Sequence, residues 1–312
     1  MPFHLTPRPE VATSTPTPRL SRRDFLAGMA IGGTGIMVGC SRRAGSDGNE
    51  GGWYAWLADT HVAADPRATL RDEVMAENLK RVVDDILEAD DPPHGVVVDG
   101  DLAYHDGQPK DYDTFLATTA PLRAAGIPMH LALGNHDDRS HVRSALKALL
   151  PADPLDEKLV GVVEGKGLRM LLLDSLQKPN VTPGRLGRRQ LGWLAGELDA
   201  HPEAPAIVFV HHNLNASWQS ALLDTDDLLG VLVPRRQAKA VVFGHTHVWN
   251  PRQLDGLHAI NLPAVGYRFL PKQPLGWCVF RPTDCGGELE LRCVGGDRRQ
   301  HGRRVPLTWR ST

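Results

Sequence analysis

Five apolar runs of strand length end abruptly in acids, amides or histidines, and this recurrence constrains the fold more than any other feature of the chain. The segments that follow these runs are Asp59-Thr60-His61, Gly100-Asp101, Gly134-Asn135-His136-Asp137, His211-His212 and Gly244-His245-Thr246-His247. In open α/β sheets, the loops that leave the carboxyl ends of strands line one edge, and ligands bind there. The sequence therefore predicts that five separated segments deliver their side chains to one rim.

The apolar runs alternate with stretches of helical period, a pattern typical of an α/β fold in which helices cover a buried sheet. We expect strands at residues 53–58, 96–98, 129–133, 168–173, 207–210 and 240–243. We expect helices at residues 70–89, 112–124, 142–150 and 188–198. From His258 onward, short strands with Gly/Pro turns, including 276–280 and 288–294, are expected to complete a second, antiparallel sheet.

Taken in order, the polar segments resemble the signature of the calcineurin-like metallophosphoesterase family, and the match covers roughly residues 53–249. Residues 187–198 resemble a helix of its cyclic-nucleotide phosphodiesterase branch, although packing of an amphipathic helix into the core is the better explanation of the leucines there. The resemblance implies an α/β fold, a double β-sheet sandwich flanked by helices, with two metal ions at one edge. It assigns one metal to Asp59, His61 and His247, the other to Asn135, His211 and His245, and the bridging position to Asp101.

The residue types suit this task on chemical grounds. Carboxylate, amide and imidazole ligands favour Mn, Fe or Zn. Two dications together with the negative charges of Asp59, Asp101 and a bridging hydroxide give the site a net charge of roughly +1. This positive charge attracts a phosphate. A bridging hydroxide could then attack the phosphorus of a phosphodiester or phosphomonoester.

The overall charge gives no such attraction. The 35 basic and 37 acidic residues leave a formal net charge of -2. Nucleic-acid binding is therefore not expected, and a small phosphate ester is the expected partner.

His136 is the candidate general acid, because the family's Gly-Asn-His motif places it beside a metal-bound amide and facing the leaving group. A supporting hydrogen bond is the other role open to it. His212 is a possible phosphate contact, and so is Arg139, which follows the same loop.

Tyr104 departs from the family pattern, since many relatives carry an aspartate at that position. Purple acid phosphatases have a tyrosine there as a ferric ligand, but they lack the histidine found here as His61. We expect Tyr104 to support the site without binding metal. A monoesterase resembling purple acid phosphatases remains one alternative, and a non-catalytic metal-binding interaction module is another.

Residues 1–39 resemble a twin-arginine export signal, with Ser21-Arg22-Arg23-Asp24-Phe25-Leu26 followed by an apolar run at 27–39. Met37-Val38-Gly39-Cys40 resembles a lipobox. These features predict the twin-arginine machinery as a partner, lipidation and membrane anchoring at Cys40, and a periplasmic or cell-envelope location. A disordered arm with a chance Arg-Arg pair is the alternative.

The expected division is a tether at 40–52, a catalytic domain at 53–300 and a C-terminal tail at 301–312. In an oxidising compartment, Cys278, Cys285 and Cys293 permit one disulfide. Cys278 and Cys293 lie in two strand-like runs and are the preferred pair.

Overall fold

The computed structural model describes residues 52–150, 155–214, 220–254 and 256–311. The expected export signal, Cys40 and the tether up to residue 51 lie outside these ranges. In the part of the chain described, no helix is both long and apolar enough to cross a bilayer.

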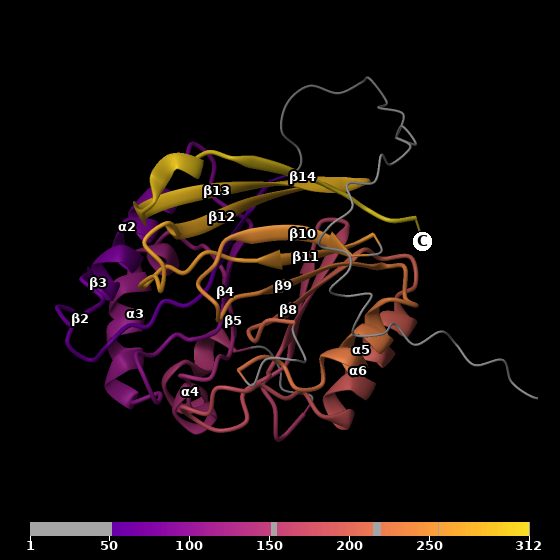
Figure 1. Cartoon of the computed structure of the whole chain (residues 1–312), viewed down its shortest axis with the longest axis horizontal. Coiled ribbons are helices and arrows are strands. Elements are labelled where there is room, and N and C mark those ends of the chain that lie inside the picture. Colours follow the sequence, from indigo (N-terminus) through magenta and orange to yellow (C-terminus); the bar gives the residue numbers. More distant parts are fainter. Residues whose placement is uncertain (1–51, 151–154, 215–219, 255, 312) are drawn as a thin grey trace, which may run out of the picture. The chain divides into compact units, whose positions relative to one another are not determined.

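The first sheet has six strands in the order β14-β13-β12-β1-β4-β5 (Figure 1). Its parallel part runs through β1 (Tyr54–Leu57), β4 (Gly95–Asp99) and β5 (Met129–Ala132). The helices α2 (Met75–Leu87) and α3 (Pro109–Ala124) connect these strands in chain order. The antiparallel part consists of β12 (Pro274–Thr283), β13 (Gly286–Gly296) and β14 (Arg304–Thr308).

The second sheet also has six strands, in the order β10-β11-β9-β8-β7-β6. The strands β7 (Leu168–Leu173), β8 (Ala206–Val210), β9 (Ala238–Phe243) and β11 (Leu257–Asn261) run parallel. The edge strands β6 (Gly161–Gly165) and β10 (Asn250–Leu254) are antiparallel to their neighbours. The helices α5 (Arg188–Ala200) and α6 (Thr225–Leu232) connect β7, β8 and β9, and the short α4 (Arg139–Ala145) precedes β6.

The alternation of side chains along β1 shows how two faces of one strand serve two cores. Ala55 and Leu57 pack towards α2 and α3, whereas Tyr54 and Trp56 enter the layer between the sheets. Trp56 stacks on Phe280 of the first sheet at 4.3 Å between ring centroids and meets Phe209 of the second sheet edge-on at 5.2 Å. Aromatic contacts of this kind add to the apolar area that drives burial. The two sheets therefore pack face to face, as the predicted sandwich requires.

A third core lies on the outer face of the second sheet. Leucines of α5 and α6 pack there against β7, β8 and β9, including Leu191, Leu194, Leu198, Leu228 and Leu232. Helices thus flank both sheets, which confirms the predicted fold class.

The helix expected at residues 70–89 begins later than predicted. Thr69–Leu70 and Glu73–Val74 form a small hairpin, β2 and β3, and α2 starts only at Met75. Arg71 and Asp72 form its turn, with φ of 52° and 66°. Positive φ values are incompatible with a right-handed helix, so the helix cannot include this turn.

The region after His258 also differs from the prediction. Only β11 joins the second sheet, and it runs parallel to β9, while β12, β13 and β14 complete the first sheet. Residues 301–312 are not a tail, because β14 pairs with β13 and Leu307 is buried. Arg310 donates hydrogen bonds to the carbonyls of Ala238 and Leu232 in the layer of the second sheet, so the end of the chain joins both layers.

The predicted disulfide between Cys278 and Cys293 is wrong for this structure, in which both thiols are free and buried. Cys278 lies opposite Leu291, and Cys293 lies opposite Gly276. The two cysteines are therefore diagonal neighbours, which lie roughly 7–8 Å apart in a sheet. A disulfide needs a closer approach than this.

Candidate metal centre

Every predicted metal ligand follows the carboxyl end of a parallel strand. The first sheet supplies Asp59 and His61 after β1, Asp101 after β4 and Asn135 after β5. The second sheet supplies His211 after β8, and His245 and His247 after β9. Since the two sheets pack together, these strand ends meet at one rim, as the sequence predicts.

The turns that carry the ligands have unusual backbone geometry. Five of the ligands adopt positive φ values, namely Asp59 (55°), His61 (47°), Asp101 (50°), His245 (68°) and His247 (55°). Aspartate, asparagine and histidine enter this region more readily than other residues with a side chain, yet it still costs free energy. Such outliers gather at functional sites, where the surrounding structure holds them in place.

Two glycines allow the ligand loops to approach one another. A Cβ atom at Gly100 would lie 2.6 Å from Nδ1 of His211, and one at Gly134 would lie 2.5 Å from the backbone nitrogen of Asp101. Both distances are too short for any side chain. The close approach of the loops therefore requires glycine at both positions.

The first group of ligands is formed by Asp59, His61 and His247, whose ligand atoms lie within 4.8 Å of one another. Nε2 of His247 is 3.3 Å from Oδ1 of Asp59 and 3.2 Å from Nε2 of His61. Nδ1 of His247 donates to the carbonyl of Tyr267 at 2.6 Å. This bond leaves the lone pair on Nε2, so the ring is oriented to bind a cation.

The second group is formed by Asp101, His211 and His245, again within 4.8 Å. Nδ1 of His211 donates to the carbonyl of Asp99 at 2.7 Å, which directs Nε2 into the site. Oδ1 of Asn135 is buried and has no hydrogen-bond partner within the protein. A buried acceptor left unpaired costs roughly 1–3 kcal/mol. A cation in this position would satisfy it, so the donor set fits a metal.

Asp101 connects the two groups. Its Oδ2 atom lies 3.2 Å from Nε2 of His211 and 3.6 Å from Nε2 of His61. Its Oδ1 atom accepts a hydrogen bond from the backbone nitrogen of His136 at 2.8 Å. One carboxylate thus stands between both sets of ligand atoms, in the position that a bridging ligand requires.

The protonation of the histidines differs across the site. Burial lowers the pKa of His61 to about 3 and that of His245 to about 4, so both are neutral at pH 7. Burial also acts to lower the pKa of His211, but the carboxylates of Asp101 and Asp59 outweigh it and raise that pKa to about 10. Without a cation, His211 therefore carries the positive charge that the carboxylates require.

Binding of a cation should release this proton, and its affinity should depend on pH. Only neutral imidazole binds a metal, so His211 must lose its proton, which is held up to about pH 10. Affinity should rise about tenfold per pH unit through the neutral range and fall as the pH is lowered. Titration calorimetry with Mn²⁺ in buffers of different protonation enthalpy should show about one proton released. Affinity that is independent of pH, without proton release, would contradict this account.

His136 lies beside the site and is only partly buried. Its ring packs edge-on against His61 at 5.0 Å between centroids, and one of its ring nitrogens lies within 4.8 Å of a ring nitrogen of His61 and of a carboxylate oxygen of Asp101. Nδ1 donates to the carbonyl of His105 at 2.6 Å. Nε2 is therefore the ring nitrogen left free, as a proton donor to a leaving group would require.

Asp137 fixes the relative position of two ligand loops, a role that the sequence did not reveal. Its carboxylate accepts hydrogen bonds from the backbone nitrogens of Gly134 at 2.9 Å and Leu102 at 3.1 Å, and from the hydroxyl of Tyr112 at 3.3 Å. The first donor belongs to the Asn135 loop and the second to the Asp101 loop. The Gly-Asn-His-Asp motif contains this residue, but only the fold shows what it binds.

The two predicted substrate contacts have other positions in the structure. Arg139 pairs with the buried carboxylate of Asp174, at 3.0 Å through its terminal nitrogen, and also donates to the carbonyl of Leu176. Its guanidinium is therefore committed to protein groups. His212 is fully buried, with Nδ1 2.7 Å from Oγ of Ser175 and its ring 4.7 Å from that of His245. Its ring packs against that of the ligand His245, and we assign neither residue to the substrate.

Tyr104 contributes its backbone to the site, since its carbonyl lies 3.4 Å from Nδ1 of His61. That contact orients a ligand and does not require the phenol.

Tyr267 and Phe269 are further residues of the site that the sequence analysis missed. The Tyr267 ring lies 4.7 Å from that of His61, and the Phe269 ring lies 4.4 Å from that of His247. Their segment follows β11, so the same strand-end rule could have found it.

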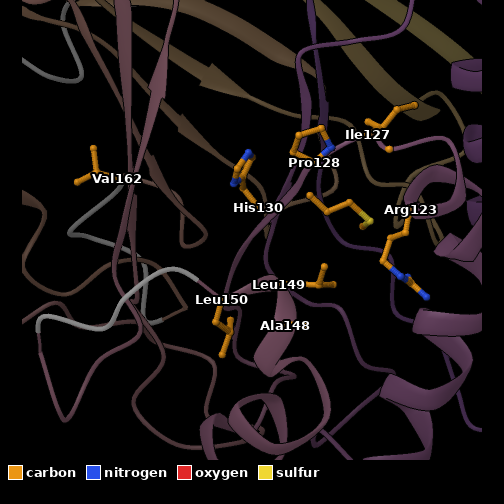
Figure 2. Close-up of a pocket in the computed structure, with 10 residues that line it drawn as sticks. Arg123, Ile127, Pro128, His130, Ala148, Leu149, Leu150 and Val162 are labelled. Atoms are coloured by element: carbon orange, nitrogen blue, oxygen red, sulfur yellow. The ribbon is translucent and has the colours of Figure 1, made fainter.

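A separate cavity of about 470 Å³ lies at the other end of β5 (Figure 2). Pro128, Met129 and His130 line it, together with Arg123 and Leu149. These residues stand at the start of the strand, whereas Asn135 follows its end. The cavity is therefore distinct from the metal centre.

Comparisons with known proteins agree with this geometry. Residues 53–249 match the family model described as calcineurin-like phosphoesterase. The chain is 28% identical over 220 residues to the 3',5'-cyclic adenosine monophosphate phosphodiesterase CpdA of Pseudomonas aeruginosa, covering 69% of this chain and 76% of that protein. It is 34% identical over 199 residues to a probable cyclic nucleotide phosphodiesterase of Rhodococcus erythropolis, covering 61% of this chain and 63% of that one.

Among solved structures, the fold resembles a dimetal phosphatase from Danio rerio with a TM-score of 0.65. The two are 17% identical, and the similarity covers 83% of this chain and 99% of the other. A structure of PhoD is similar with a TM-score of 0.56 at 12% identity, covering 82% of this chain and 68% of that one. At such identities the similarity concerns the fold alone.

Proposed function

Because the chain belongs to the calcineurin-like phosphoesterase family, we propose that it hydrolyses small phosphodiesters with two metal ions, and that cyclic-nucleotide-like esters are its substrate class. The observation that carries this proposal is the position of Asp101. Its carboxylate lies between two complete groups of ligand atoms, 3.2 Å from Nε2 of His211 and 3.6 Å from Nε2 of His61.

The metal chemistry can be stated briefly. Two cations in this site would lower the pKa of a shared water and would stabilise the charge that develops on the oxygens around phosphorus. Asp59, His61, His247 and Asp101 would hold one cation, and Asn135, His211, His245 and Asp101 the other. Mn, Fe and Zn all suit these oxygen and nitrogen donors.

The protein's own contribution is proton transfer and positioning. Protonated His136 carries its transferable proton on Nε2 and gives it to the leaving oxygen. The bond from Nδ1 to the carbonyl of His105 then keeps the neutral ring in the same orientation. The backbone nitrogen of His136 also donates to Asp101. The proton donor and the bridging carboxylate are therefore held at a fixed separation.

The relatives support the choice of substrate class. The proteins from Pseudomonas aeruginosa and Rhodococcus erythropolis are both named as cyclic nucleotide phosphodiesterases. His61 also favours this class over the alternative that resembles purple acid phosphatases, because its Nε2 points into the first ligand group. The position of His136 argues against a non-catalytic metal-binding module, which would need no proton donor.

The test is hydrolysis by purified protein before and after removal of metal. We expect elemental analysis to find about two metal ions per chain, and hydrolysis of bis(4-nitrophenyl) phosphate to exceed that of the monoester 4-nitrophenyl phosphate. Chelation should lower kcat by roughly a thousandfold, and added Mn²⁺ should restore it, because metal stabilisation amounts to several kcal/mol.

Each alternative predicts a different result. A monoesterase would prefer the monoester. A non-catalytic module would bind metal but hydrolyse neither compound. Full turnover after chelation would refute the two-metal proposal itself.

A further inference from the structure

Phe269 is an exposed aromatic side chain beside the metal centre. Four large hydrophobic residues are exposed in the described part of the chain, and Phe269, at 44% exposure, is the aromatic one among them. Leu270, the next residue, is 54% exposed. Exposed apolar area is unfavourable in water and often marks a binding surface when it adjoins a functional site.

The Phe269 ring is positioned by the ligands themselves. It lies 4.4 Å from the ring of His247, with 32° between their planes, and meets Tyr267 edge-on at 5.4 Å. The carbonyl of Tyr267 in turn accepts the hydrogen bond from His247. A group resting on Phe269 would therefore lie next to the first group of ligands.

The segment that carries Phe269 is attached to the ligand turns. The backbone nitrogen of Gly266 donates to the carbonyl of Asp59 at 2.8 Å, and that of Val265 donates to the carbonyl of Ala58 at 3.0 Å. A Cβ atom at Gly266 would lie 2.6 Å from the carbonyl oxygen of Thr60. The segment thus packs directly on the turn that follows β1, and the ring is held at a fixed distance from the metal ligands.

An arginine already stacks on this ring. The guanidinium carbon of Arg71, in the β2–β3 turn, lies 5.0 Å from the centre of the Phe269 ring. Arg71 is exposed, and a neighbouring ion pair between Arg268 and Glu73 at 3.5 Å connects the hairpin to the aromatic segment. Guanidinium planes and aromatic rings are the surfaces on which nucleobases stack in proteins.

We propose that Phe269 and Arg71 form a stacking platform for the nucleobase of a nucleotide whose phosphate lies at the metal centre. This inference rests on the proposed function and extends it by naming the group beyond the phosphate that is recognised. Tyr267 supports the platform, because its ring packs edge-on against that of Phe269. Arg71 contributes both a planar surface and a positive charge that suits an anionic nucleotide.

The test compares two phosphomonoesters that differ only in the base. Adenosine monophosphate carries a base, whereas ribose 5-phosphate has the same sugar and phosphate without it. Calorimetry on the Mn²⁺-loaded protein should show that adenosine monophosphate binds about tenfold more tightly, as expected for one base on one aromatic ring. Phe269→Ala should remove this preference, and Phe269→Trp should retain it. Leu87→Ala, which changes another exposed apolar side chain on α2, is the matched control and should also retain it.

The possible failures can be told apart. Equal affinity of the unaltered protein for the two compounds would overturn the platform, and so would a preference that survives Phe269→Ala. Neither result depends on turnover of a diester, because calorimetry measures the binding of these two monoesters. A protein that prefers the base but hydrolyses no ester would support the platform and refute the proposed function.

Discussion

Asp101→Asn should lower kcat/KM for a phosphodiester by roughly a thousandfold or more, because it removes the one carboxylate shared by both ligand groups. Asparagine preserves the shape of the side chain, which matters because Gly134 packs directly against it. The amide is neutral, so its oxygen brings no negative charge to offset the repulsion between two cations and should bridge them poorly. The measurement is steady-state kinetics together with elemental analysis, which should show fewer than two metal ions per chain.

The matched control for this substitution is Asp113→Asn, which makes the same chemical change at an exposed position on α3. It should leave kinetics and metal content unaltered. Circular dichroism and thermal melting should show that both variants fold. An Asp101→Asn protein that kept two metals and its full rate would rule out the bridging assignment.

His136→Gln should lower kcat by roughly a hundredfold to ten-thousandfold while leaving the metal content unchanged, since the histidine donates a proton and is not assigned to either metal. The size of the loss should depend on the leaving group. An alkoxide leaving group needs a proton, so its ester should lose most. A 4-nitrophenolate leaving group is stable without one, so bis(4-nitrophenyl) phosphate should lose much less.

This dependence separates catalysis from metal binding. The distinction matters because a ring nitrogen of His136 lies within 4.8 Å of a ring nitrogen of His61 and of a carboxylate oxygen of Asp101. If His136 were a metal ligand, its replacement would lower the metal content and would slow both esters alike. His201→Gln, at the end of α5, provides the same change at an exposed histidine and should have no effect.

The parallel strands could be predicted because each is a short apolar run buried on both faces. The run at residues 168–173 corresponds to β7 without any shift, and those at β4, β8 and β9 differ by one or two residues. The antiparallel strands were harder to place. The local sequence of β12 does not predict its partner strand. β12 pairs with β1, more than 200 residues earlier, although β11 is much nearer in the chain. The pairing brings together residues far apart in the chain, such as Trp56 and Phe280, whose rings stack.

The metal ligands could be predicted because they are tied to the strands. Each follows a strand end within a few residues, so a correct strand and a polar turn were enough to name it. The surroundings could not be predicted in this way. The partner of Arg139 is Asp174, 35 residues away, and the four donors around Asp137 come from three different segments. Such partners depend on how loops meet in space, and no local pattern encodes them.

The left-handed turns at the ligands have a consequence for the protein without its cations. The left-handed backbone of each of these five residues costs about 1 kcal/mol or more of free energy. Together they lower the stability of the rim by several kcal/mol. Bound cations would offset this cost, whereas the buried strands beneath do not depend on them. The rim should therefore open locally before the sheets do, and amide hydrogen exchange there should slow markedly on loading with metal. In this fold, bound cations would determine the stability of the catalytic edge against local unfolding. The hydrophobic core determines the stability of the sandwich.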